Sequence, residues 1–281
     1  MGNVVNALAF PVPPKDLSLH ALRSRESELF FLKAAVGRIP AIFLRRPNAV
    51  FTIIYSHGNA EDVGLSLQYL DLLSVSCECN VFAYEYPGYS IAEGVPSESG
   101  VYQSINAAHE FLLREGILPE AIVIFGRSLG TGPSIDICSR YPRIAGCILQ
   151  SPLESGIRCV MGTVPSYLLY GLDVFRSYEK IGRIKCPVLI MHGELDEIVP
   201  CRNGRALYAA LQERATHEEV AYEPVWLPAA GHNNMPINEC LEHCRRFLDY
   251  LYKRRTPNDL VAKQDNIGVK TKRLEKSEKI F

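Results

Sequence analysis

Ser128 lies in a short pattern, Gly126-Arg127-Ser128-Leu129-Gly130, that matches the G-x-S-x-G arrangement of nucleophilic serines. An apolar run, AIVIF at 121–125, precedes the pattern, and a helix-compatible run, SLGTGPSIDICSR at 128–140, follows it. A strand that turns this sharply into a helix strains the serine backbone and brings the residues two before and two after it together. Glycine at both positions removes that collision. The spacing therefore predicts a nucleophilic hydroxyl at the carboxyl edge of a sheet.

A serine hydroxyl is a poor nucleophile by itself, so it needs a base that is oriented by a carboxylate. Asp196 follows the apolar run PVLIM at 187–191, and His232 follows PVWLP at 224–228. Serine, acid and histidine must occur in this order along a chain of this architecture. The sequence therefore predicts a catalytic triad of Ser128, Asp196 and His232.

Other carboxylates and histidines compete for the acid and base roles. Glu194 and Glu197 are alternatives to Asp196 as the acid. His192 precedes a glycine in a turn at a strand end, where we favour a structural role. The remaining candidates belong to predicted helices (His109, His243) or predicted polar loops (His20, His217).

Stabilisation of the developing oxyanion requires backbone N–H donors aimed at the reacting carbonyl. The N–H of Leu129, at the start of the helix after the nucleophile, is one predicted donor. The second should come from the loop after the apolar run 49–56, where we favour Asn59 over Ala60. His57, in the same loop, is interpreted as a residue that braces the loop.

The elements that must position these residues alternate between apolar runs and amphipathic stretches. Near-continuous apolar strands are typical of sheets that are buried on both faces, and strands alternating with helices predict right-handed crossovers and a mostly parallel sheet. The first two runs, being close together, predict an antiparallel hairpin at the sheet edge. The fold class is therefore α/β. The predicted strands are 28–36, 39–45, 49–56, 80–86, 121–126, 146–151, 186–193 and 224–228.

The chain divides into three parts by composition. Residues 1–28 contain several prolines and are expected to form an arm laid on the domain, which spans 29–252. Within the domain, 152–185 has helix-like fragments without a clear strand, which predicts a small cap. Residues 253–281 carry nine basic against four acidic side chains, a net charge of +5, and few large apolar residues. This composition predicts a largely disordered basic tail.

The overall composition excludes several classes of protein. Thirty Lys and Arg against 31 Asp and Glu argue against a dedicated nucleic-acid binder. No apolar run is long enough for a membrane span, and the first residues lack the features of a secretory signal. Nine cysteines at no repeating interval indicate free thiols in a reducing compartment. Cys240 and Cys244, one helical turn apart, are interpreted as buried apolar side chains, and we expect no metal site.

Six motifs along the chain are HGNAEDVG (57–64), YEYPGYS (84–90), GRSLGTGPS (126–134), SPLESG (151–156), PVLIMHGELDEIVP (187–200) and GHNN (231–234). Together these motifs resemble the α/β-hydrolase fold family of serine hydrolases. Within that family the chain is similar to the small-capped α/β-hydrolase-domain proteins that remove palmitate from protein cysteines. The resemblance extends from about Leu8 to Tyr252. The family's palmitoylated N-terminal cysteine cluster has no counterpart here, because the first cysteine is Cys77.

This resemblance implies serine hydrolysis without a cofactor, through Ser128, Asp196 and His232. The favoured function is a palmitoyl-protein thioesterase that acts on an acylated protein or a lipid-like ester. The alternatives are a serine peptidase, a small-molecule carboxylesterase or lipase and, more remotely, a non-catalytic binding scaffold. Tyr84, Tyr86 and Tyr89 could either line a pocket or pack its wall.

The localisation expected from these features is cytoplasmic, with peripheral association at the cytosolic face of a membrane. Met1-Gly2 begins like a myristoylation site, although Asn6 stands where Ser or Thr is typical. Gly2 is thus a candidate lipidation site. One acyl chain gives only marginal membrane binding, so the basic tail would have to contribute as well. The sequence gives no oligomeric state.

Overall fold

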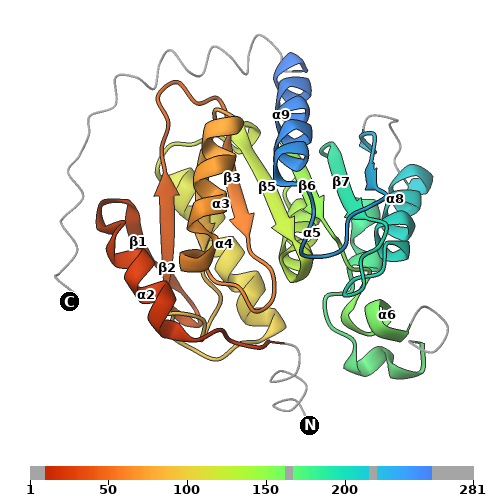
Figure 1. The fold of residues 1–281 in the computed structure, drawn as a ribbon, viewed down its shortest axis with the longest axis horizontal. Helices are drawn as coiled ribbons and strands as arrows, with labels where there is room; N and C mark the ends of the chain where they lie inside the picture. Colours follow the sequence, from red (N-terminus) through yellow and green to blue (C-terminus); the bar gives the residue numbers. More distant parts are fainter. Residues whose placement is uncertain (1–9, 162–166, 215–219, 255–281) are drawn as a thin grey trace.

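The computed structural model describes residues 10–161, 167–214 and 220–254. An eight-stranded sheet, ordered β1-β2-β4-β3-β5-β6-β7-β8, runs through this part of the chain (Figure 1). Strands β3 to β8 are parallel, and β2 pairs with both β1 and β4 in antiparallel register. The strands are β1 (Leu29–Ala34), β2 (Gly37–Leu44), β3 (Thr52–Ser56), β4 (Asn80–Tyr84), β5 (Ile122–Arg127), β6 (Gly146–Gln150), β7 (Val188–Gly193) and β8 (Val225–Leu227).

Helices cover both faces of the sheet. In Figure 1, α3 and α9 lie over the near face, and α4 and α5 lie behind the strands. α2 packs on α3, and α3 also contacts α9. The helices are α2 (Lys15–Arg23), α3 (Val63–Ser76), α4 (Glu98–Arg114), α5 (Thr131–Arg140), α6 (Gly156–Met161), α8 (Arg202–Arg214) and α9 (Ile237–Lys253).

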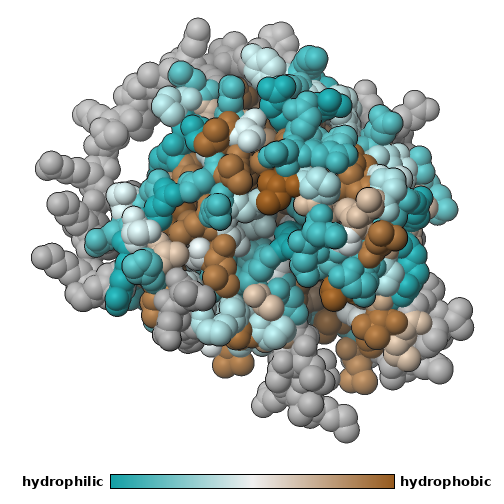
Figure 2. Space-filling model, viewed as in Figure 1, coloured by the Kyte–Doolittle hydropathy of each residue, from teal (hydrophilic) through white to brown (hydrophobic). Residues whose placement is uncertain are grey.

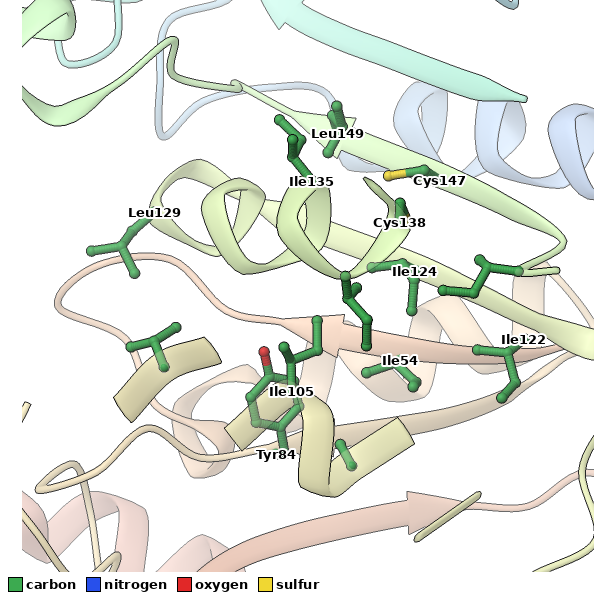
Figure 3. Packing of buried hydrophobic residues seen from close by; sticks show 14 of the residues in the cluster. Ile54, Tyr84, Ile105, Ile122, Ile124, Leu129, Ile135, Cys138, Cys147 and Leu149 are labelled. Carbon is green, nitrogen blue, oxygen red and sulfur yellow. The ribbon is translucent and has the colours of Figure 1, made fainter. Parts of the chain in front are cut away.

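Two apolar clusters, one on each face, form the core. Alternate residues of one strand enter different clusters, because successive side chains of a strand point to opposite faces. Ile124 of β5 belongs to the cluster under α4 and α5, whereas Val123 and Phe125 belong to the cluster under α3 and α9. Figure 3 shows part of the first cluster, with Ile135 of α5 beside Leu149 of β6. Burial on both faces explains why these strands are apolar at nearly every position.

The fold class predicted from the sequence, a mostly parallel sheet of the α/β-hydrolase type flanked by helices, is confirmed. The predicted antiparallel hairpin is formed by β1 and β2, with β1 at the sheet edge. Among the described residues of 152–185, the structure has α6 and three short 3₁₀ helices, Tyr167–Leu172, Ser177–Glu179 and Ile181–Arg183.

One predicted loop is wrong, since His20 lies inside α2. Proline is tolerated at the start of a helix, and Pro14 is the N-cap residue of α2. Gly2, His217 and residues 255–281 of the basic tail lie outside the described residues.

Candidate active site

The turn between β5 and α5 places Ser128 at the carboxyl edge of the sheet. Ser128 has a φ of 52°, in the left-handed region that side-chain-bearing residues rarely adopt. A Cβ at Gly126 would lie 2.4 Å from the carbonyl oxygen of Gly130, and one at Gly130 would lie 2.1 Å from that of Ser56. Both glycines are therefore required by close backbone contacts, as the sequence pattern predicts.

Ser128, His232 and Asp196 form a continuous hydrogen-bonded chain. The Oγ of Ser128 lies 2.9 Å from Nε2 of His232. On the other side of the ring, Nδ1 of His232 lies 2.8 Å from Oδ2 of Asp196. With Nδ1–H donating to the carboxylate, Nε2 is the acceptor for the serine proton. The structure thus brings together three side chains that are 36 and 104 positions apart along the chain.

Asp196 is held in place by more than the His232 ring. Its Oδ1 accepts the backbone N–H groups of Ile198, at 3.0 Å, and Val199, at 2.7 Å. Burial alone raises the pKa of Asp196, but hydrogen bonds from His192, His232 and the Val199 N–H outweigh it and hold that pKa well below its usual range. Asp196 is therefore a carboxylate at neutral pH.

Glu194 and Glu197, the two alternatives for the acid, lie on the surface and not beside His232. Both are exposed, and Glu194 pairs with Arg205 on the surface. Neither glutamate has a hydrogen bond to His232 among the described contacts, so Asp196 is the carboxylate that meets the histidine.

His192 is a site residue whose contact the sequence did not reveal. Its Nε2 lies 2.8 Å from the carbonyl oxygen of Val199 and 3.3 Å from Oδ2 of Asp196. The ring is fully buried. The structural role predicted for His192 therefore includes a contact that helps to hold Asp196. Its position four residues before Asp196, at the end of β7, was the available signal.

Asn59 and Leu129, the two residues predicted to supply oxyanion donors, line the same cavity as Ser128. Their loops are tied together by an ion pair between Arg127 of the elbow and Glu61. Glu61 also accepts the N–H of Gly58, at 3.0 Å. The nucleophile turn and the Asn59 loop are therefore linked by side chains as well as by the pairing of β3 with β5.

The Asn59 loop is also braced by a buried hydrogen bond between His57 and Glu85. Nε2 of His57 lies 2.8 Å from Oε1 of Glu85, and its Nδ1 lies 2.9 Å from the Gly58 carbonyl oxygen. Glu85 also accepts the N–H groups of Tyr86 and Val63, each at 3.0 Å. The bracing role predicted for His57 corresponds to these contacts, whereas Glu85 was not singled out by the sequence.

An apolar cavity of about 540 Å³ opens beside Ser128. Its walls come from α6, the turn after β6, the loop before α8 and residues near Phe175, and none of the described residues that line it is charged. At its rim Val160 and Ile198 are exposed by 80% and 56%. Hydrophobic side chains reach the surface at the lower right of Figure 2, where α6 lies in Figure 1. The residues are Asn59, Ser128, Leu129, Leu153, Gly156, Ile157, Cys159, Val160, Met161, Leu172, Val174, Phe175, Ile198 and Val199.

Tyr84, Tyr86 and Tyr89 do not line this cavity. All three are buried and pack edge to face, Tyr84 on Tyr86 and Tyr86 on Tyr89. Of the two interpretations of these tyrosines, wall packing is the correct one.

Within the described ranges, no group of three or more His, Cys, Asp or Glu side chains could hold a metal ion. Cys240 and Cys244 are buried in the cluster under α9, and burial raises the pKa of Cys240 to about 11. No helix in this part of the chain is long and apolar enough to cross a membrane.

Comparisons with known proteins agree with this architecture. The sequence model of the prolyl oligopeptidase family matches residues 163–255. An esterase of Pyrococcus furiosus has a TM-score of 0.63 at 15% identity, covering 87% of this chain and 97% of the esterase. A monoacylglycerol lipase of Paleococcus ferrophilus has a TM-score of 0.59 at 18% identity, covering 80% and 99%. At these identities the likeness concerns the fold.

Two relatives are much closer in sequence. The chain is 41% identical over 206 residues to α/β-hydrolase domain-containing protein aho-3 of Caenorhabditis elegans, covering 72% of this chain and 59% of that protein. It is 38% identical over 225 residues to human α/β-hydrolase domain-containing protein 17B, covering 79% of this chain and 75% of the human protein. The chain therefore belongs to the family of α/β-hydrolase domain-containing proteins 17, within the α/β-hydrolase superfamily.

Proposed function

We propose that this protein is a serine hydrolase that removes long acyl chains from protein thioesters through an acyl-enzyme intermediate. The observation that carries the proposal is the hydrogen-bonded Ser128–His232–Asp196 chain at the edge of an uncharged apolar cavity. The hydroxyl is next to its base, and the space beside it suits a hydrocarbon chain.

The mechanism follows from the geometry. His232 removes the proton from Ser128 as Oγ attacks the acyl carbonyl, and Asp196 holds the ring and stabilises the imidazolium. The N–H groups of Leu129 and Asn59 stabilise the oxyanion. The thiol leaves, the acyl group stays on Ser128, and water activated by His232 then releases the fatty acid.

Two considerations favour a fatty thioester as the substrate. The cavity volume falls within the roughly 300–1,000 Å³ that is typical of small-molecule pockets. A cysteine thiolate, with a pKa of about 8.5, also leaves with little help from an acid, unlike an amide nitrogen. A peptidase that recognises a free amino terminus would need a carboxylate in the pocket, and the described lining has none.

The test is a series of thioesters that share one thiol and differ in acyl length from butanoyl to hexadecanoyl. Each buried CH₂ is worth roughly 0.8 kcal/mol, so kcat/KM should rise by up to about fourfold per CH₂ until the cavity is full. The Ser128→Ala variant is the control for background hydrolysis, and a fluorophosphonate probe should label wild type but not this variant.

Two results would contradict the proposal. Equal or greater efficiency on an aminoacyl amide than on the hexadecanoyl thioester would favour a peptidase, the activity that the prolyl oligopeptidase match suggests. A preference for butanoyl over longer chains would favour a small-molecule esterase.

A further inference from the structure

A second cavity, of about 270 Å³, includes His232 in its lining. It is lined by His232, by Arg127 and Glu61, and by apolar side chains that include Leu65, Met235 and Ile237. Ser128 lines the first cavity and His232 the second, and neither residue lines both. The hydrogen bond between Ser128 and His232 thus joins a residue of one cavity to a residue of the other.

In acyl transfer, the acyl chain and the leaving group occupy different positions around the reacting carbon. In the tetrahedral intermediate the carbon carries the serine oxygen, the oxyanion, the acyl chain and the leaving atom. His232 faces the leaving atom, because the water that Nε2 activates in deacylation attacks from the position that the leaving atom has vacated. The leaving atom must therefore lie on the side of the carbon that faces His232, away from the acyl chain.

We infer that the cavity beside His232 is the leaving-group subsite, and that it accepts an uncharged, preferably aromatic or aliphatic side chain next to the acylated cysteine. This inference rests on the proposed function. The inference adds a second kind of substrate specificity, which depends on the residues next to the acylated cysteine and not on the acyl chain.

The charges on the cavity wall support an uncharged occupant. Arg127 pairs with Glu61 and also donates to Oδ1 of Asn233 at 3.1 Å. The charges of Arg127 and Glu61 therefore already have partners. A charged ligand in this cavity would lose its hydration without gaining an ion-pair partner.

Unpartnered apolar surface points to the same occupant. Leu65 of α3 is 46% exposed and Ile237 of α9 is 49% exposed, although both are large apolar side chains. Hydrophobic atoms also reach the surface between α3 and the start of α9 (Figure 2). A side chain seated between Leu65 and Ile237 would cover both.

The test uses octanoyl thioesters of three short peptides, in which the cysteine is flanked by glycines, by phenylalanines or by aspartates. The thiol and the acyl group are shared, so only the neighbours differ. Wild type should cleave the phenylalanine peptide about tenfold faster in kcat/KM than the glycine peptide, because partial burial of an aromatic side chain is worth roughly one factor of ten. The aspartate peptide should be slower than the glycine peptide.

The variants Leu65→Asp and Ile237→Asp should abolish the preference for phenylalanine. Labelling by the fluorophosphonate probe, which carries no peptide leaving group, shows that each variant is folded. Leu72→Asp is the matched control, since Leu72 is an exposed leucine two turns further along α3 and lines neither cavity. This control should behave as wild type.

The possible failures are distinguishable. A wild-type enzyme that cleaves no acyl thioester and takes no fluorophosphonate label contradicts the proposed function itself. An active enzyme without preference among the three peptides, or with a preference that survives both variants, overturns only the subsite.

Discussion

The His57–Glu85 and His232–Asp196 pairs, both buried near the carboxyl edge of this sheet, differ in what the second ring nitrogen meets. In both pairs the nitrogen–oxygen distance is 2.8 Å. The other nitrogen of His57 faces the carbonyl oxygen of Gly58, whereas the other nitrogen of His232 faces the hydroxyl of Ser128. A carbonyl oxygen can only accept a hydrogen bond, but a hydroxyl can give up its proton.

The comparison shows that a carboxylate partner does not by itself make a histidine a base. His57 has acceptors at both nitrogens, so a proton that it holds has no route to a substrate. His232 has an acceptor on one side and a donor on the other, which is the arrangement for proton transfer. The first pair holds a loop and the second has the geometry that the proposed chemistry needs, and the two can be separated by mutation.

The largest expected effect is on turnover, in the pair that contains His232. His232→Ala and Ser128→Ala should each lower kcat by several orders of magnitude, up to about 10⁶-fold as in a protease whose triad acts as a unit. Steady-state kinetics on a long-chain thioester measures this loss. The urea unfolding midpoint should change little, because Asp196 keeps its bonds from Ile198, Val199 and His192 after His232 is removed. A variant that retains more than a few per cent of wild-type activity would contradict the site assignment.

Asp196→Asn should cost less, about 10⁴-fold in kcat, since an amide preserves the shape but favours the wrong ring tautomer. KM should remain within a few-fold of wild type. Steady-state kinetics on the same thioester measures both kcat and KM for wild type and variant. Loss of activity in Glu194→Gln instead would show that the acid was assigned to the wrong carboxylate.

The other pair should give the reverse result, with the larger effect on stability. His57→Ala removes the ring that hydrogen-bonds to the buried Glu85 side chain, and losing one partner of a buried hydrogen bond costs about 1–3 kcal/mol. Urea denaturation followed by circular dichroism measures the loss. Folded His57→Ala at low temperature should still react with a fluorophosphonate probe, whereas His232→Ala should not. Equal stability of the two variants would remove the distinction between the pairs.

The smallest effect concerns pH. The folded pKa of Asp196 lies below its usual value, so the ionised carboxylate stabilises the fold, and this stabilisation is complete above the unfolded pKa of about 3.9. The contribution disappears as the pH falls through the lower folded pKa. The difference in unfolding free energy between wild type and Asp196→Asn should therefore be constant from pH 7 to pH 5 and shrink below about pH 4. A difference that grows in acid would mean that the pKa is raised in the folded state.

The sequence predicted the features that depend on local pattern. The apolar runs predicted the positions of the strands, because a strand in a sheet covered by helices on both faces carries apolar side chains on both faces. The glycines at 126 and 130 gave the elbow because the turn imposes backbone contacts that only glycine allows. The order of Ser128, Asp196 and His232 then followed from the end points of three strands.

What the sequence did not reveal depends on contacts between distant segments. Glu85 is 28 positions from His57, and no local pattern marks a glutamate in an apolar stretch as the partner of that histidine. The second cavity combines side chains from the elbow, α3 and the loop before α9, so only the packing of these elements creates it. His20 was placed in a loop because the prolines before it suggested turns, yet Pro14 begins a helix.

The register of β3 and β5 has a consequence for how this enzyme loses its site on heating. Ser56 pairs with Gly126, so the loop with Asn59 and the turn with Ser128 emerge side by side from two adjacent strands in the middle of the sheet. Amides of central strands exchange with solvent only when the whole domain opens. The backbone that carries Ser128 and Asn59 should consequently persist until the cooperative melting of the sheet, so that slow amide exchange in β3 and β5 disappears only at the melting temperature.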